Sequence, residues 1–200
     1  IVLQDIDATA FEALLQFLYG MLPEMINAEN DDYFIDTNED QAKLILFVAD
    51  RFGCTDLKLH MESYLIRNAL VPSKAAQLLL MADSHSLPLL KEACMNTYMA
   101  NPQTVQQSEK GWKNLQESNK LLLELLNYST SGRRNYSSFI NDGTGTMNDA
   151  DAYDVRSLRE RLEAYELDLD GSREMLLQRW KEYLSAQRGD DDVGANNSRS

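Results

Sequence analysis

Apolar residues recur every three or four positions along most of this chain, the spacing that places them on one face of a helix. The clearest case lies in residues 153–184, whose first half carries such a stripe at Val155, Leu158, Leu162 and Tyr165. The second half repeats the spacing with Leu176 or Leu177, Trp180 and Leu184. The pattern predicts two short amphipathic helices in this segment.

A different pattern joins the two stripes. Leu and Asp alternate through residues 167–170, as in an extended link. Gly171 then supplies a flexible residue, and Ser172 supplies an N-cap for the next helix. Two helices that each carry one apolar stripe hide those stripes by packing against each other. Residues 153–187 are therefore predicted to form a small helix–link–helix module.

The first two thirds of the chain show the same helical spacing in several shorter segments. The first predicted helix is capped either by Asp7 or by Thr9 together with Glu12, and Gly20 stops it. Further helices are predicted at residues 40–51, 55–68, 72–83 and 88–97, with shorter pieces to about residue 126. Short strand candidates lie at residues 1–3 and 33–35. Short connections between helices favour an antiparallel, mainly α array.

Two segments outside the predicted helices have the composition of flexible chain. Residues 129–152 are rich in Ser, Thr, Asn, Gly and Asp, which predicts a flexible linker. Residues 188–200 are polar and low in complexity, which predicts a disordered tail. The chain begins at Ile1 without an initiator Met, so we expect it to be a fragment.

Charge and hydropathy narrow the classes of partner. The chain has 200 residues, of which 44% are hydrophobic and 26% charged, enough for one medium core and a smaller unit. Its formal net charge of −13 disfavours nonspecific attraction to nucleic acid or anionic lipid and favours protein partners. The longest apolar runs fall well short of the roughly 18–20 residues that cross a bilayer, so no membrane association is predicted.

Few residues are candidates for catalysis or metal binding. Cys54 and Cys94 sit in apolar helical contexts away from other metal ligands, so free thiols are expected, a disulfide between them being the alternative. Asp83, Ser84 and His85 adjoin in sequence, but no nucleophile elbow accompanies them. The acidic stretch of residues 21–40 lacks the glycine-centred calcium loop. We therefore predict a protein that is not an enzyme, with no cofactor and no metal.

The helix–link–helix segment resembles the SAP motif of chromatin and nucleic-acid proteins. Its leucines at 158 and 162, the turn of residues 169–173 and residues 176–180 carry the resemblance. The resemblance implies binding to DNA, commonly AT-rich duplex, without catalysis. The candidate contacts among the cationic side chains are Arg156, Arg159, Arg173, Arg179 and Lys181. The backbone N–H groups at the start of the second helix, at Gly171 and Ser172, are expected to face a phosphate oxygen.

Electrostatics leave an alternative open for this module. Residues 147–188 contain seven basic and ten acidic side chains, a net charge of −3, which opposes phosphate binding. In the alternative, the helices form a protein-docking or purely structural pair. The same cations then pair with acidic residues at helical spacing on a solvated face.

A second resemblance covers residues 1–126. Residues 11–20, then 46–53 with Leu57 and Lys58, resemble the C-terminal half of a BTB (POZ) domain, assigned to residues 1–70. Residues 68–71, 75–83, 85–86, 89–94 and 111–113 continue like the BACK-type helices of MATH-BTB and ankyrin-BTB proteins, assigned to residues 71–128. The first half of such a BTB domain would lie upstream of Ile1.

That resemblance implies a substrate adaptor of a cullin-3 ubiquitin ligase. In the family, the BTB domain dimerises and binds the cullin, the helical pair at about residues 71–99 here completes the groove, and another domain binds the substrate. The resemblance thus implies a cullin scaffold, an unknown substrate and a homodimer of the full-length protein as partners. A DNA-binding regulator that oligomerises through BTB and a self-associating scaffold are the alternatives. The expected location is the nucleus, the cytoplasm or both.

Overall fold

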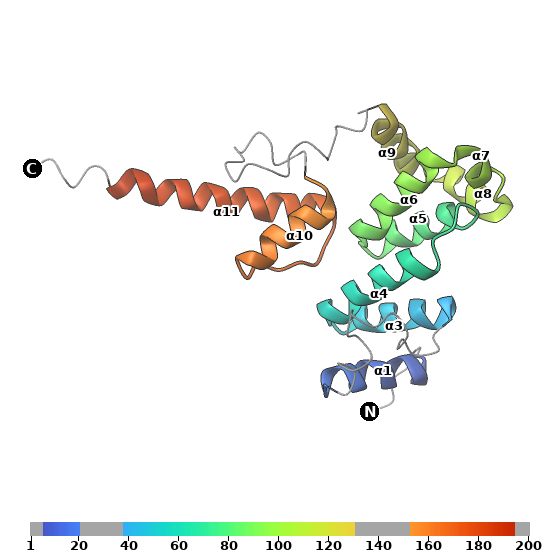
Figure 1. The fold of residues 1–200 in the computed structure, drawn as a ribbon, viewed down its shortest axis with the longest axis horizontal. Coiled ribbons are helices and arrows are strands. Elements are labelled where there is room, and N and C mark those ends of the chain that lie inside the picture. The colour runs from blue at the N-terminus through green and yellow to red at the C-terminus, as the bar shows by residue number, and fades with distance from the viewer. Residues whose placement is uncertain (1–5, 21–37, 131–152, 195–200) are drawn as a thin grey trace, which may run out of the picture. The chain divides into compact units, whose positions relative to one another are not determined.

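The computed structural model describes residues 6–20, 38–130 and 153–194, and these are helical with no strand among them (Figure 1). The mainly α class is therefore confirmed. The strand candidates at residues 1–3 and 33–35 lie outside the described residues, as does nearly all of the predicted linker. The helices are α1 (Ala8–Leu18), α3 (Glu39–Arg51), α4 (Thr55–Asn68), α5 (Ala75–Ser84), α6 (Pro88–Ala100), α7 (Pro102–Gln106), α8 (Glu109–Glu117), α9 (Asn119–Thr130), α10 (Val155–Ala164) and α11 (Arg173–Gly194).

The chain forms two compact units, Ile1–Ser118 and Asn119–Ser200. In the first unit α3 packs against α1 and α4, and α4 in turn packs against α6. Helix α5 pairs with α6 and with α8, while α7 bridges α6 and α8. The first unit is thus a stack of short helices in which α1, α3 and α4 follow one another and α6, not α5, packs next on α4 (Figure 1).

Local signals explain where these helices begin and end. The carboxylate of Asp7 accepts a hydrogen bond from the backbone N–H of Ala10 (2.9 Å), which settles the cap of α1 in favour of Asp7. Asn38 caps α3 in the same way through the N–H of Gln41 (2.9 Å). Gly20 and Gly53 adopt φ values of +68° and +67° just beyond α1 and α3, a conformation that glycine tolerates best.

Helix α8 approaches α5 closely because a glycine lies at their contact. A Cβ atom on Gly111 would stand 3.1 Å from the backbone nitrogen of Gln77 and 3.3 Å from the Cβ of Ala76. The adjacent Trp112 lies parallel to Tyr98 of α6, with ring centroids 5.7 Å apart, and so helps to pack α8 against α6. These contacts bring α5, α6 and α8 together.

In the second unit α10 and α11 pack against each other, as the two apolar stripes predict. Leu176, not Leu177, is the fully buried member of the second stripe. The core of this pair consists of Val155, Leu158, Leu162, Leu176 and Trp180. Helix α11 continues to Gly194, whereas the sequence predicts a disordered tail from residue 188; adding a turn to an existing helix avoids the cost of nucleation.

In the part of the chain that the structure describes, every helix is too short or too polar to cross a membrane.

Candidate functional site

Arg179 of α11 holds the link between the two helices of the module. Its guanidinium donates to the backbone oxygens of Asp168 (2.6 Å) and Asp170 (3.1 Å), and it also pairs with the Asp168 carboxylate (2.9 Å). A planar guanidinium is well suited to several acceptors at once. One of the predicted DNA contacts is thus engaged in the module's own fold.

The start of α11 is also tied to the rest of the module. Arg173 donates to the backbone oxygen of Tyr153 (2.9 Å), just before α10. Gly171 is buried, and its N–H donates to the carboxylate of Asp170 (2.8 Å), whereas the sequence interpretation has this N–H facing outward to a phosphate. Ser172 caps the helix through the N–H of Met175 at the longer distance of 3.4 Å.

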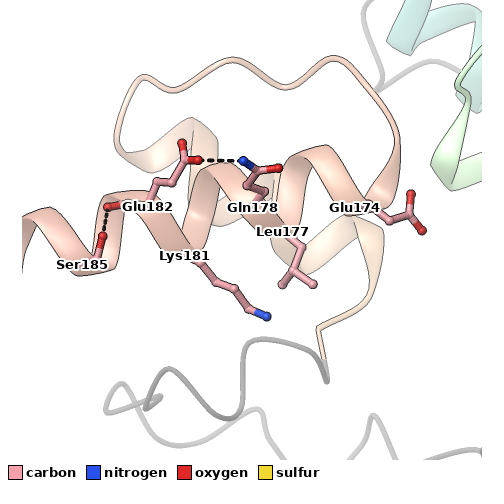
Figure 2. Close-up of a pocket in the computed structure, with 6 residues that line it drawn as sticks. All are labelled: Glu174, Leu177, Gln178, Lys181, Glu182 and Ser185. Carbon is pink, nitrogen blue, oxygen red and sulfur yellow. Dashed lines mark hydrogen bonds between the residues drawn. The ribbon is translucent and has the colours of Figure 1, made fainter.

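The remaining predicted DNA contacts are the cationic side chains Arg156, Arg159 and Lys181. Arg156 is exposed on α10, and Arg159 is half-buried there. Lys181 lies in a shallow hollow along one side of α11. Figure 2 shows the residues that line this hollow, which are Glu174, Leu177, Gln178, Lys181, Glu182 and Ser185. Two carboxylates therefore accompany the one cation of the hollow, and DNA binding by this module stays a prediction.

An aromatic face, which the sequence interpretation missed, lies on the same module. We define it as Tyr165, Trp180 and Tyr183 together with Arg161. The ring centroids of Tyr165 and Tyr183 are 4.6 Å apart, and Trp180 lies 5.8 Å from Tyr165 and 5.6 Å from Tyr183. The Arg161 guanidinium carbon lies 4.2 Å from the centre of the Tyr153 ring and 5.9 Å from Trp180. Tyr165 is 51% exposed, so the face reaches solvent.

In the first unit the Asp83, Ser84 and His85 side chains go to three different partners. The His85 ring stacks on Phe47 (4.4 Å) and its Nδ1 lies 3.5 Å from an oxygen of Asp50. Asp83 pairs with Lys91 (2.8 Å), and the Ser84 hydroxyl donates to the backbone oxygen of Leu80 (2.7 Å). The three adjacent residues thus form no nucleophile–base arrangement.

Two charged side chains of α4 are buried in the first unit. Lys58 is 3% exposed and pairs with Asp50 of α3 (2.7 Å). Glu62 is fully buried, and one of its oxygens accepts the backbone N–H of Leu90 in the first turn of α6 (2.9 Å). Lys58 thus joins α4 to the preceding helix, and Glu62 joins it to α6, which is not the next helix in the chain. The signal that could have revealed them is their position on the same face of α4 as Met61 and Leu65.

The cysteines and the other histidine also belong to the fold. Cys54 and Cys94 are free thiols, as predicted, and burial raises the pKa of Cys94 well above its usual value. Burial lowers the pKa of His60, and the nearby charge of Arg67 lowers it further. Among the described residues, no group of His, Cys, Asp or Glu side chains is arranged to hold a metal ion.

Glu39, at the first turn of α3, binds both Lys43 (2.5 Å) and Lys74, which precedes α5. Burial of this carboxyl favours its neutral form, but hydrogen bonds from the two lysines and their charges outweigh burial and lower the pKa of Glu39. A lowered folded-state pKa means that the ion pairs stabilise the fold above the carboxyl's ordinary pKa, and that this contribution disappears as the pH falls through the folded-state value.

We therefore expect Glu39→Gln to lower the free energy of unfolding by up to about 1 kcal/mol at pH 7 and by nothing measurable at pH 2. Urea unfolding at both pH values, followed by circular dichroism, measures the difference. Asp40→Asn is the matched control, because the Asp40 side chain is 92% exposed and 3.9 Å from Lys43. An equal loss at both pH values would contradict the electrostatic account.

Comparison with known proteins supports a BTB/POZ-like region. No family model and no solved structure matches the chain. The BTB/POZ and MATH domain-containing protein 3 of Arabidopsis thaliana is 30% identical over 172 residues, covering 80% of this chain and 40% of that protein. The TD and POZ domain-containing protein 2 of Mus musculus is 28% identical over 123 residues, covering 61% of this chain and 30% of that protein.

A third relative is the Protein maternal effect lethal 26 of Caenorhabditis elegans, 32% identical over 76 residues that cover 38% of this chain and 19% of that protein. The chain thus spans between about a fifth and two fifths of the length of these relatives. The likeness to POZ-named proteins supports a role in protein interaction. It adds nothing on the BACK-like or SAP-like segments, which stay predictions.

Proposed function

We propose that this protein is a protein-interaction adaptor, and more specifically a substrate adaptor of a cullin-3 ubiquitin ligase. The observation that carries the proposal is the likeness to POZ-named relatives, which in one case covers 80% of this chain. The first unit is a packed array of helices, the class of structure that the BTB and BACK resemblance implies.

An adaptor of this kind works by holding surfaces in place while bond chemistry takes place elsewhere. The first unit is suited to such a role because two buried charged side chains hold its helices together. Lys58 joins α4 to α3, and Glu62 joins α4 to α6. In this proposal a cullin binds the first unit, the full-length protein dimerises, and another surface binds the substrate. Its place of action is the nucleus, the cytoplasm or both.

The cullin surface is proposed to include Val71, which lies between α4 and α5 and is 44% exposed. Val71→Asp should weaken binding to the cullin-3 N-terminal domain by about tenfold or more, because a carboxylate would have to be desolvated at the contact. Isothermal titration calorimetry measures the affinity for the cullin-3 domain, both for the 200-residue chain and for the full-length protein.

Gln107→Asp serves as the matched control, since Gln107 is exposed just beyond α7 and outside the proposed groove. Absence of any complex between cullin-3 and the complete protein at micromolar concentration would remove the cullin proposal. Equal loss in the two variants would instead assign the effect to net charge and remove Val71 from the contact.

A second candidate function is DNA binding by the α10–α11 module. The observation in its favour is that α10 and α11 pack as the helix–link–helix of the SAP resemblance, with Arg156 exposed on α10. Arg156→Glu is the sharpest test, because Arg173 and Arg179 are engaged in the module's own fold and their replacement would also damage it.

If the module binds DNA, Arg156→Glu should weaken binding to AT-rich duplex by about tenfold at low salt and flatten the dependence of affinity on salt. Fluorescence anisotropy at two salt concentrations measures both effects. The control is Glu160→Gln on the same helix, whose loss of a negative charge should strengthen a phosphate contact. An affinity for duplex DNA that neither substitution changes would contradict a phosphate contact on α10.

A further inference from the structure

The aromatic face of the α10–α11 module has the composition of a protein-binding hot spot. It is made of Tyr, Trp and Arg side chains, the residue types most enriched at the energetic centres of protein interfaces. Tyr165 is 51% exposed, and Tyr183 is half-buried with its hydroxyl accepting from the Gln187 amide (2.8 Å). The rings are in mutual contact, so their positions are set before any partner arrives.

Two donors at this face lack an acceptor within the described residues. Arg161 contacts the aromatic rings of Tyr153 and Trp180, and no carboxylate of the described residues pairs with it. Trp180 is 4% exposed, and its indole N–H is buried without a hydrogen-bond partner there. The indole N–H lies beneath the face, out of reach of a partner, whereas the guanidinium above the aromatic rings keeps its N–H groups for an anion.

We propose that the aromatic face binds an extended segment of a partner protein that carries a carboxylate beside an apolar side chain. The carboxylate pairs with Arg161, and the apolar side chain packs on the rings of Tyr165 and Tyr183. The inference rests on the proposed adaptor function, for which it supplies the class of substrate.

The charge of the module favours this partner over a nucleic acid. Arg161 is a single cation on the face, while residues 147–188 carry a net charge of −3. Nucleic-acid binding draws its free energy from several cations that displace counterions along a chain of phosphates. A short segment with one carboxylate requires only one cation, and the remaining contacts are aromatic and apolar.

The test uses the 200-residue chain and fluorescein-labelled peptides of about twelve residues, long enough to extend across the face. One peptide repeats Asp-Leu-Pro and the other repeats Asn-Leu-Pro, so the two differ only in charge. Anisotropy should show tighter binding of the Asp peptide by about fivefold, a preference that Arg161→Gln abolishes. Tyr165→Ala should weaken both peptides by about tenfold. Tyr19→Ala, an equally bulky change at a 75% exposed tyrosine of the first unit, should change neither.

An NMR spectrum of the indole N–H groups supplies an independent readout. The Trp180 signal should move on binding, while that of Trp112 in the first unit should not. The proposal would be overturned if the Arg161→Gln variant still preferred the Asp peptide. It would also be overturned if neither peptide bound at about 1 mM, a concentration at which weak binding is still detected. Tighter binding of labelled oligothymidylate, lost in Tyr165→Ala, would overturn it in favour of nucleic acid.

Failure of this inference is distinguishable from failure of the proposed function. Val71→Asp changes the proposed cullin contact and should leave peptide binding intact, while Tyr165→Ala should leave cullin binding intact. A protein that binds cullin but no peptide refutes only the docking inference. A protein that binds the peptide but no cullin refutes the ligase proposal and leaves the docking surface standing.

Discussion

Replacing Glu62 by alanine should lower the free energy of unfolding of the first unit by about 2–4 kcal/mol. The carboxylate is fully buried and accepts the N–H of Leu90 in the first turn of α6. The N-cap of that helix is Leu87, which has no side-chain oxygen, and its first residue is Pro88, which has no N–H. Alanine would leave the Leu90 donor without this acceptor and would open a cavity between α4 and α6.

Urea unfolding followed by circular dichroism measures this loss, and two variants separate its causes. Glu62→Gln keeps a carbonyl oxygen in the same place, so it should cost less than half as much as alanine. Glu12→Ala removes an exposed carboxylate from α1 and should change the free energy by no more than about 0.5 kcal/mol. Equal losses in Glu62→Gln and Glu62→Ala would show that the hydrogen bond to Leu90 contributes little.

The positions of the helices were largely predictable because their signals are local. Helix α4 runs over residues 55–68 as predicted, since Gly53 ends the preceding helix and the apolar stripe is regular. The prediction for α5 began at residue 72, three residues early. There Val71 and Lys74 close a turn through a backbone hydrogen bond (2.9 Å), and the helix starts only at Ala75. Proline at residue 72 suits a turn as well as a helix start.

The long-range polar contacts were not predictable, because sequence spacing carries no information about partners on other elements. Arg179 was interpreted as a phosphate contact or as part of a solvated face, yet its partners are the two aspartates of the link, nine and eleven residues earlier. In the first unit, Glu62 and Lys58 likewise pair with groups on other helices, which their spacing in the sequence does not reveal. A charged residue in register with an apolar stripe is buried only if tertiary structure supplies a partner.

The aromatic face was missed for a geometrical reason. Tyr165 continues the spacing of Leu158 and Leu162, which predicts a buried side chain, but α10 ends at Ala164. Glu166 then adopts a φ of +55°, so the chain leaves the helical path at Tyr165. The ring consequently lies at the edge of the core, 51% exposed, where it contacts Trp180 and remains accessible. A predicted core position thus becomes part of a surface.

Replacing Gly171 by alanine should destabilise the α10–α11 module by about 2–4 kcal/mol. Gly171 has a φ of +114°, which a residue with a Cβ adopts only under strain. A Cβ there would also lie 3.1–3.2 Å from the side chain of Met175. The residue is buried at the point where the link enters α11, so neither the backbone nor α11 can shift without loosening the contact of Leu176 with the core.

Gly53→Ala separates the two causes, because Gly53 also has a positive φ (+67°) but nothing lies within 4 Å of its added Cβ. It should cost the first unit only the backbone strain, about 1–2 kcal/mol. Adding Met175→Ala to Gly171→Ala removes Sδ and Cε of Met175, both 3.1 Å from the added Cβ, and should restore only the part of the loss that crowding by these two atoms causes. If Gly171→Ala were neutral in thermal and urea unfolding, the link would have an alternative path, and the fixed geometry that places Tyr165 beside Trp180 would not depend on this turn.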